Sequence, residues 1–227
     1  MKETSPEENE RKPPNECNSA WVEISRQLNR QPDNSATLLC IGPLTNLADW
    51  LDNEVSSDLL SLKLNKIIIL GGNHPSSRMS NVEFNFSLDP IAAHCVLSKS
   101  IFKEKLYLIS TGGVCDYDAL IQTLGQQRLD GFIKKSKISS ENSNQSFFLP
   151  TLLQFDTGAF CLSCDPVSAF VASNPKRCQW EHLPVQVDSS TGLVFAATTN
   201  TDTKISIATR IDLEGYFDWI CTLLPDG

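Results

Sequence analysis

The length, composition and charge of this chain exclude several classes of protein. Its 227 residues suffice for one domain with a sizeable core, and 41% hydrophobic and 20% charged residues are ordinary for a globular protein. The net charge of -8, without a clustered basic face, argues against nucleic acid as the main partner, and no apolar run approaches the ~20 residues of a membrane span.

The amino terminus and the cysteines bear on location. Residues 1–17 are polar and acidic with a Pro pair, which predicts a disordered tail and no signal peptide. The eight cysteines are expected to be free thiols, because the chain is long and rich in core residues. We therefore expect a cytoplasmic protein with no membrane partner and one folded domain over residues 18–224.

The first half of the chain alternates between helical and strand patterns. Apolar spacing predicts helices over 19–31, from Pro43 to Leu51, and from Asp89-Pro90 onward. Short apolar runs predict strands over 36–41, 66–70 and 105–110. Strand and helix alternating at these spacings indicate right-handed βαβ units, so we predict an open α/β fold with a mainly parallel sheet flanked by helices.

The second half is less regular. A helix is predicted over 116–135 with interruptions at Gly125 and Gly131, followed by a polar loop over 137–146. Asp165-Pro166 opens an apolar helix through Ala172. Three short strands over 184–187, 193–197 and 204–210 and a closing helix over 215–224 complete the prediction.

Two strands end in turns of the kind that bind ligands. Ile41-Gly42-Pro43 and Leu70-Gly71-Gly72-Asn73 should lie at the same edge, since the carboxyl ends of parallel strands meet there. Glu83 and Asn85 flank Phe84, so in an extended segment their side chains share one face. A carboxylate beside an amide suits the vicinal hydroxyls of a sugar. An ordinary capped loop is the open alternative.

Other polar residues allow more than one interpretation. Asp165 is either a helix N-cap or a ligand of a hard cation. The order of Cys161, Cys164, Cys178 and His182 has zinc-site spacing, although no glycine-rich knuckle surrounds it. His94 is expected to pack within its helix, whereas His74 follows the Gly-Gly-Asn turn and could reach a ligand.

Four segments together resemble the inosine-uridine-preferring nucleoside hydrolases. Residues 40–48, CIGPLTNLA, resemble the family's G-P-L-T-N-(I/L)-A segment, and residues 70–73 resemble its M-G-G-(G/N) turn. Residues 83–93 carry the pattern E-F-N-x…D-P-x-A-A, and Cys164-Asp165-Pro166 resembles H-D-P. The order and spacing also agree, over roughly residues 19 to 222.

The resemblance implies a glycosidase that hydrolyses the N-glycosidic bond of a nucleoside to ribose and base, in nucleoside catabolism and salvage. It implies a Ca²⁺ ion held by the Ile41 carbonyl and the Asp165 carboxylate, with Glu83 and Asn85 on the ribose hydroxyls. Leu70 stands where the family has a Met near the ribose, and Asn73 is a weaker candidate at the same edge.

The chain departs from the family in three ways, one of which is that the loop between Asn73 and Glu83 and the turn at Thr111-Gly112-Gly113 match it poorly, so no base preference is predicted. The D-x-D-x-x-x-D-D motif, which supplies the general-base Asp and most calcium carboxylates, is missing, and Cys164 replaces the His of H-D-P. Calcium needs about six to eight oxygen ligands, so we expect weak calcium and nucleoside binding. Either the chain is a truncated nucleoside hydrolase, incomplete at its amino terminus, or it is a catalytically inactive relative that binds or scaffolds. An unpaired strand edge would make it a homo-oligomer.

Overall fold

The structure, a computed structural model, describes residues 20–52, 54–76, 82–102, 104–111, 114–141, 162–197 and 204–223. The predicted tail over 1–17 and the candidate zinc ligand Cys161 lie outside the described residues. Within the described ranges, no helix is long and apolar enough to cross a membrane.

The described strands form one sheet with the order β1-β2-β3-β6-β4-β5. β1 pairs with β2, β2 with β3, and β3 with β6 in parallel, whereas β4 is antiparallel to both β6 and β5. The predicted mainly parallel α/β sheet is thus confirmed, with an antiparallel pair added at one side. The strands are β1 (Ala36–Cys40), β2 (Leu64–Asn73), β3 (Leu106–Thr111), β4 (Cys178–Val187), β5 (Val194–Ala196) and β6 (Lys204–Ile211).

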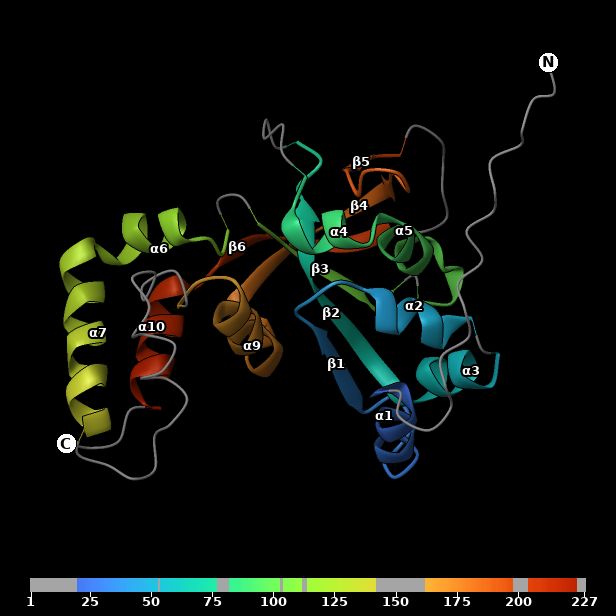
Figure 1. Ribbon diagram of the computed structural model, residues 1–227, viewed down its shortest axis with the longest axis horizontal. Helices are drawn as coiled ribbons and strands as arrows, with labels where there is room; N and C mark the ends of the chain where they lie inside the picture. The colour runs from blue at the N-terminus through green and yellow to red at the C-terminus, as the bar shows by residue number, and fades with distance from the viewer. Residues whose placement is uncertain are drawn as a thin grey trace, which may run out of the picture.

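Helices cover both faces of this sheet (Figure 1). One layer holds α1 (Ala20–Leu28), α2 (Thr45–Leu51), α3 (Glu54–Lys63), α4 (Phe84–Leu88) and α5 (Pro90–Ser98). The other holds α6 (Tyr117–Leu124), α7 (Gln126–Glu141), α9 (Asp165–Ser173) and α10 (Leu213–Cys221). Two short 3₁₀ turns, η1 (Ser100–Phe102) and η3 (Pro175–Arg177), precede β3 and β4.

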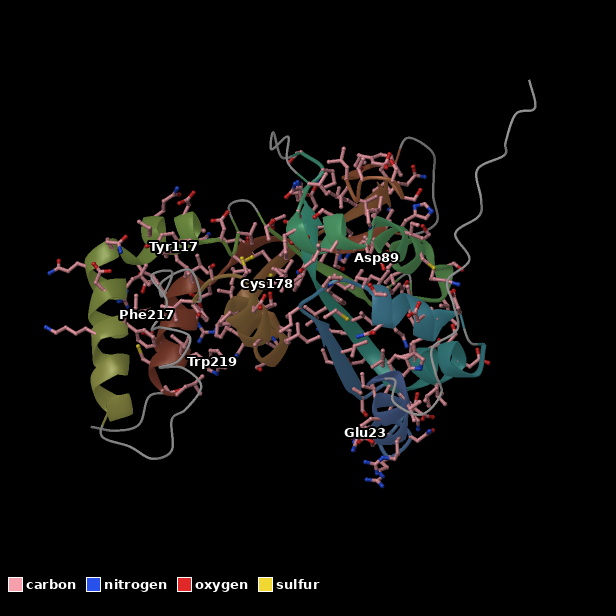
Figure 2. The ribbon with its side chains drawn as sticks, viewed as in Figure 1. Glu23, Asp89, Tyr117, Cys178, Phe217 and Trp219 are labelled. Carbon is pink, nitrogen blue, oxygen red and sulfur yellow. The ribbon has the colours of Figure 1, made fainter. Side chains whose placement is uncertain are left out.

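The alternation of side chains along β2 explains the two layers. Ile67 and Ile69 are buried in the core cluster under α2 and α5, whereas Ile68 and Leu70 are buried in the cluster under α9 and α10. A parallel strand covered on both faces is expected to be apolar throughout. The second cluster also contains Phe217 of α10, with Trp219 packed against it (Figure 2).

Several element boundaries differ from the prediction. The helix expected from Pro43 begins at Thr45, and α3 was not predicted, although Leu60 buries it beside α1 and α2. Gly125, at φ +77°, does separate α6 from α7. Gly131 does not interrupt α7, which continues through the predicted polar loop to Glu141. A single glycine in a helix costs only about 1 kcal/mol, too little to end it.

Candidate functional site

The turn at the end of β2 can be formed only by glycines. Pairing between β2 and β3 becomes irregular between Leu70 and Asn73, and Gly72 has φ +64°. A Cβ on Gly71 would lie 2.4 Å from the Phe86 ring, and one on Gly72 would lie 2.7 Å from Val194. The two glycines therefore let the backbone turn sharply over the buried Phe86 ring.

Glu83 holds this turn in place. Its side chain is only 8% exposed, and it is the N-cap of α4. Oε1 accepts a hydrogen bond from the Asn85 N–H at 2.9 Å, while Oε2 accepts from Phe86 N–H at 3.1 Å and from Gly72 N–H at 3.0 Å. The open alternative of a capped loop is therefore correct for Glu83. A carboxylate has about four lone-pair sites, so three donors leave one for a ligand.

The extended conformation predicted around Asn85 is wrong, because Glu83 caps a helix that begins at Phe84. Asn85 nonetheless reaches the same strand end, since its Nδ2 donates to the Leu70 carbonyl at 3.1 Å. The side chain of Leu70 itself is 2% exposed and belongs to the second core cluster. Asn73 is also buried, and its Oδ1 accepts from the Thr111 hydroxyl at 3.4 Å. Glu83 and Asn85 are thus brought together at the end of β2.

The turn after β1 is tied to the start of α5. Thr45 Oγ1 donates to Asp89 Oδ2 at 2.6 Å, and Asp89 Oδ1 accepts from the Ala92 N–H at 2.9 Å as the cap of α5. Ile41, just after β1, is exposed at this edge, beside an apolar hollow of about 310 Å³. Because Asp89 follows α4 directly, the turns of β1 and β2 are fixed to adjoining helices.

Asp165 does not have the predicted N-cap position. Cys164 occupies that position of α9 at φ +55°, an unfavourable region for a residue with a Cβ, and makes no side-chain cap. Asp165 is the first residue of the helix, is exposed, and makes no hydrogen bond or ion pair with another described residue. Partial burial raises the pKa of its carboxyl group. This is a carboxylate that a cation or a ligand could still bind.

A second thiol, Cys115, lies against Cys164. The Cys164 N–H donates to the Cys115 carbonyl at 2.8 Å, and the Cys115 thiol donates to the Ser110 carbonyl at 3.7 Å. The interaction between the two neighbouring thiols lowers the pKa of Cys164 and raises that of Cys115, which is fully buried. The charges of Asp116 and Glu83 also raise the Cys115 pKa, so these carboxylates lie near the pair. The sequence had no signal for Cys115, because its partner is far along the chain.

The described residues do not complete a metal site. No group of three or more His, Cys, Asp or Glu among them is placed to hold an ion. Calcium needs about six to eight oxygens, and of the predicted ligands only the Asp165 carboxylate and the Ile41 carbonyl are present. These residues do not fit the ion by themselves, so no chemical step is derived through it.

The candidate zinc ligands within the described residues are not brought together. Cys178 begins β4 and His182 lies four residues further along the same strand, which separates them by about 13 Å. Zinc ligands lie about 2.0 to 2.3 Å from the metal, so these two cannot share an ion. His182 instead contacts the Ser206 hydroxyl at 3.0 Å.

The other histidines have local partners. His94 is exposed on α5, and its Nδ1 lies 2.7 Å from the Val187 carbonyl oxygen. His74 Nδ1 lies 2.8 Å from the Ser76 hydroxyl, and its Nε2 lies 3.6 Å from Glu181. His94 therefore contacts the end of β4 but stays exposed, which differs from the packed side chain that was predicted, while His74 stays beside the end of β2.

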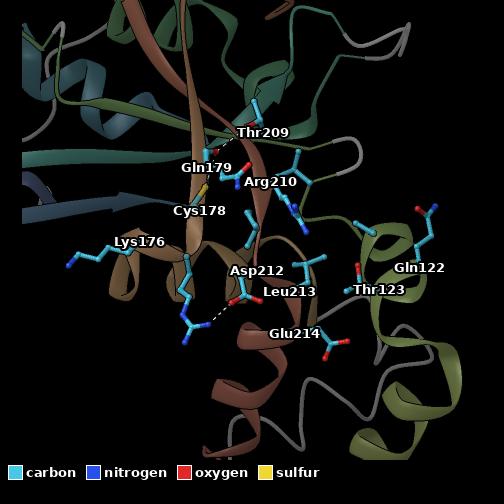
Figure 3. A pocket seen from close by; sticks show the side chains of 14 residues that line it. Gln122, Thr123, Lys176, Cys178, Gln179, Thr209, Arg210, Asp212, Leu213 and Glu214 are labelled. Carbon is cyan, nitrogen blue, oxygen red and sulfur yellow. Dashed lines mark hydrogen bonds and ion pairs between the residues drawn. The ribbon is translucent and has the colours of Figure 1, made fainter.

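A further hollow lies elsewhere, where β6 ends and β4 begins (Figure 3). It measures about 460 Å³ and contains none of the residues predicted for the site. Arg177 is paired with Asp212 at 2.6 Å, and Lys176 points away from the other lining side chains. Glu214 pairs with Arg128. Three of the charged residues that line this hollow, Arg177, Asp212 and Glu214, are therefore paired within the protein.

Comparison with known proteins places the chain in a family. The model of the inosine-uridine preferring nucleoside hydrolases matches residues 2–218. A search of curated protein sequences found no match.

Solved structures share the fold at low identity. The chain is similar to an inosine-uridine preferring nucleoside hydrolase from Bacillus anthracis (16% identity, TM-score 0.65) and to a purine-preferring ribonucleoside hydrolase from Gardnerella vaginalis (20% identity, TM-score 0.65). It is also similar to a plant nucleoside hydrolase, with 16% identity and a TM-score of 0.60. That match covers 91% of this chain and 67% of the plant protein. The first two matches cover 92% and 91% of this chain but only 66% and 65% of those proteins, just under two thirds of their length.

Proposed function

The chain belongs to the inosine-uridine preferring nucleoside hydrolase family, and on this premise we propose that it acts on ribonucleosides, hydrolysing the N-glycosidic bond to ribose and free base. The observation that carries this proposal is a pair of hydrogen bonds at the end of β2, in which Glu83 accepts from the Gly72 N–H and Asn85 donates to the Leu70 carbonyl. They place a carboxylate and an amide side by side, within the E-F-N segment that resembles the family.

The proposed ribose contacts follow from the donors and acceptors left over. Counting only the bonds among the described residues, Glu83 retains one lone-pair site, and Asn85 retains its Oδ1 and one N–H. A vicinal diol needs such acceptors and donors together. Leu70 and Asn73 would support this side of the site from the strand, with both side chains buried.

The Asp165 carboxylate at the start of α9 and the Ile41 carbonyl after β1 would face the substrate opposite Glu83 and Asn85. Glycoside hydrolysis passes through an oxocarbenium-like transition state, so carboxylates held near the ribose stabilise the developing positive charge. Glu83 is suited to this, because three N–H donors keep its carboxylate oriented. The resemblance assigns water activation to a motif that these residues do not supply, so we assign positions for binding and charge stabilisation only.

The alternative is a catalytically inactive relative that binds nucleosides. It is motivated by the absence of a D-x-D-x-x-x-D-D motif from this sequence. Both functions use the same ribose contacts, and they differ in whether the base is released.

One experiment distinguishes the two. The purified chain is incubated with inosine or uridine, with and without added Ca²⁺, and released base is measured by chromatography while calorimetry measures binding. Base release supports the hydrolase, and binding without release supports the inactive relative. Asn85→Ala should weaken binding at least about tenfold, the cost of one or two hydrogen bonds. Asn29→Ala, on an exposed residue just after α1, is the matched control. Binding that Asn85→Ala leaves unchanged would refute the proposed site.

We further propose that the chain forms a homo-oligomer in the cytoplasm. Among the described strands, β1 pairs only with β2, and its half-buried Leu38 and Leu39 line the 310 Å³ hollow. A free edge of this kind can pair with another chain. The described cysteines are free thiols, as expected in a reducing compartment. Light scattering tests the association: a monodisperse monomer would contradict it.

A further inference from the structure

Two thiols meet beside the candidate site without a role in the proposed chemistry. Cys115 follows β3 and Cys164 precedes α9, and the backbone hydrogen bond between the two residues joins segments that lie far apart in the sequence. Both are free cysteines. Cys115 is fully buried, whereas Cys164 is partly exposed and is therefore the one that a solute reaches first.

We propose that Cys115 and Cys164 are a redox-active pair, which a peroxide converts to a disulfide at the edge of the candidate site. This is a modification site of the chain itself, and it does not depend on the proposed hydrolase activity.

The backbone geometry fits a disulfide. The Cys164 N–H donates to the Cys115 carbonyl at 2.8 Å. This bond brings the two backbones into direct contact, and strand residues that exchange two bonds of this kind have Cα atoms about 5.5 Å apart. A disulfide requires Cα atoms about 4.4 to 6.8 Å apart, so the bond can close without a large movement of either segment.

The chemistry balances in two steps. The Cys164 sulfur attacks hydrogen peroxide, forming a sulfenic acid and releasing one water. The Cys115 sulfur then attacks the sulfenic sulfur, forming the S–S bond and releasing a second water. The two thiols together lose two electrons and two protons, and the peroxide is reduced to two waters. A dithiol reductant reverses the change by thiol–disulfide exchange.

The disulfide would act on the start of α9. Cys164 has φ +55° and is followed directly by Asp165. A covalent link to Cys115 would fix this strained residue to the segment after β3, and so restrict how the Asp165 carboxylate can move. The oxidised protein should therefore melt at a higher temperature than the reduced protein.

Peptide mapping tests the bridge. The intact chain is treated with a small excess of hydrogen peroxide, its remaining thiols are alkylated, and tryptic peptides are analysed by mass spectrometry. We expect peptide 106–128, which holds only Cys115, to appear linked to peptide 138–176 with the loss of two hydrogen atoms. Dithiothreitol should restore both free peptides.

Matched variants identify the sulfurs, because peptide 138–176 also holds Cys161. The linked species should persist in Cys161→Ser and disappear in Cys115→Ser and Cys164→Ser. Far-ultraviolet circular dichroism shows that each variant is folded. A link that persists in Cys164→Ser, or folded wild-type protein in which both peptides stay fully alkylated, would overturn the proposal. If a variant fails to fold, full alkylation of both peptides in the folded wild-type protein is still a result that would overturn the proposal.

Discussion

The turn after β2 and the start of α9 each present a carboxylate at the edge of the sheet, but the two are held very differently. Glu83 is buried and accepts three backbone N–H groups, one of them from Gly72. Asp165 is exposed, has no hydrogen bond to another described residue, and follows a residue at positive φ. The turn after β2 is therefore built into the fold, whereas the start of α9 keeps its charge available.

This difference separates stability from binding. A carboxylate whose lone pairs are nearly all used stabilises the fold and offers a ligand one oriented contact. A carboxylate without partners contributes little to stability and offers most of its binding capacity. Substitution of Glu83 should therefore affect stability more than ligand binding, and substitution of Asp165 should affect ligand binding more than stability.

The largest effect is expected from Glu83→Ala. It removes the acceptor of three N–H groups, including the helix cap, and should lower the free energy of unfolding by about 3 kcal/mol. Urea unfolding followed by circular dichroism measures this. Glu83→Gln keeps one amide oxygen and should lose less. Asp165→Ala, the counterpart at α9, should change stability by under about 0.5 kcal/mol. Equal losses of unfolding free energy in Glu83→Ala and Asp165→Ala would contradict the difference between the two carboxylates.

Gly72→Ala should destabilise by about 2 kcal/mol. The residue has φ +64°, and the new Cβ would lie 2.7 Å from Val194 Cγ2. Gly131→Ala is the control, because it lies inside α7 with nothing within 4 Å of the added Cβ. That control should stabilise by about 0.5 to 1 kcal/mol. Thermal melts of both variants check the opposite signs.

Asn85→Ala removes one hydrogen bond to the end of β2 and should cost about 1 kcal/mol in unfolding free energy. This is a smaller loss than at Glu83, because one contact is removed and the helix cap remains. The measurement is the same urea titration, with Asn29→Ala as the exposed control. A loss as large as that of Glu83→Ala would show that the amide, rather than the carboxylate, holds the turn.

The smallest effect concerns pH at Asp165. Burial raises the pKa of this carboxyl in the folded state, so folding favours its protonated form. The stability that the protonated form contributes is fully present below the unfolded pKa and is lost as pH rises through the folded pKa. Asp165→Asn should therefore slightly stabilise the protein at pH 7 and leave it nearly unchanged at pH 3. The gain should be under about 1 kcal/mol, since water screens an exposed charge. An Asp165→Asn variant that is less stable than the wild-type protein at pH 7 would contradict this prediction.

The sequence predicted the sheet well, because period-two and continuous apolar runs mark buried strands regardless of their neighbours. The closing helix and the break at Gly125 were predicted on similar local evidence. The motif residues also converge on one edge, since the parallel pairing of β1 and β2 requires it.

The errors occurred where long-range contacts decide the structure. Glu83 and Asn85 look extended in isolation, but the capping hydrogen bonds make Phe84–Leu88 helical. Burial of Leu60 against α1 and α2 supports α3, which has weak spacing of its own. Cys115 could not be identified, because only the folded chain brings it to Cys164.

Phe86 has a consequence for how this protein can vary. Its ring lies within 3.0 Å of a Cβ on either Gly71 or Gly72, and its carbonyl oxygen would lie 2.5 Å from a Cβ on Gly192. A side chain on Gly71 or Gly72 would meet the ring, whereas one on Gly192 would meet the Phe86 backbone, which every residue at position 86 retains. A chain that has lost the aromatic ring should therefore be free to lose Gly71, while Gly72 and Gly192, which have positive φ values, stay constrained.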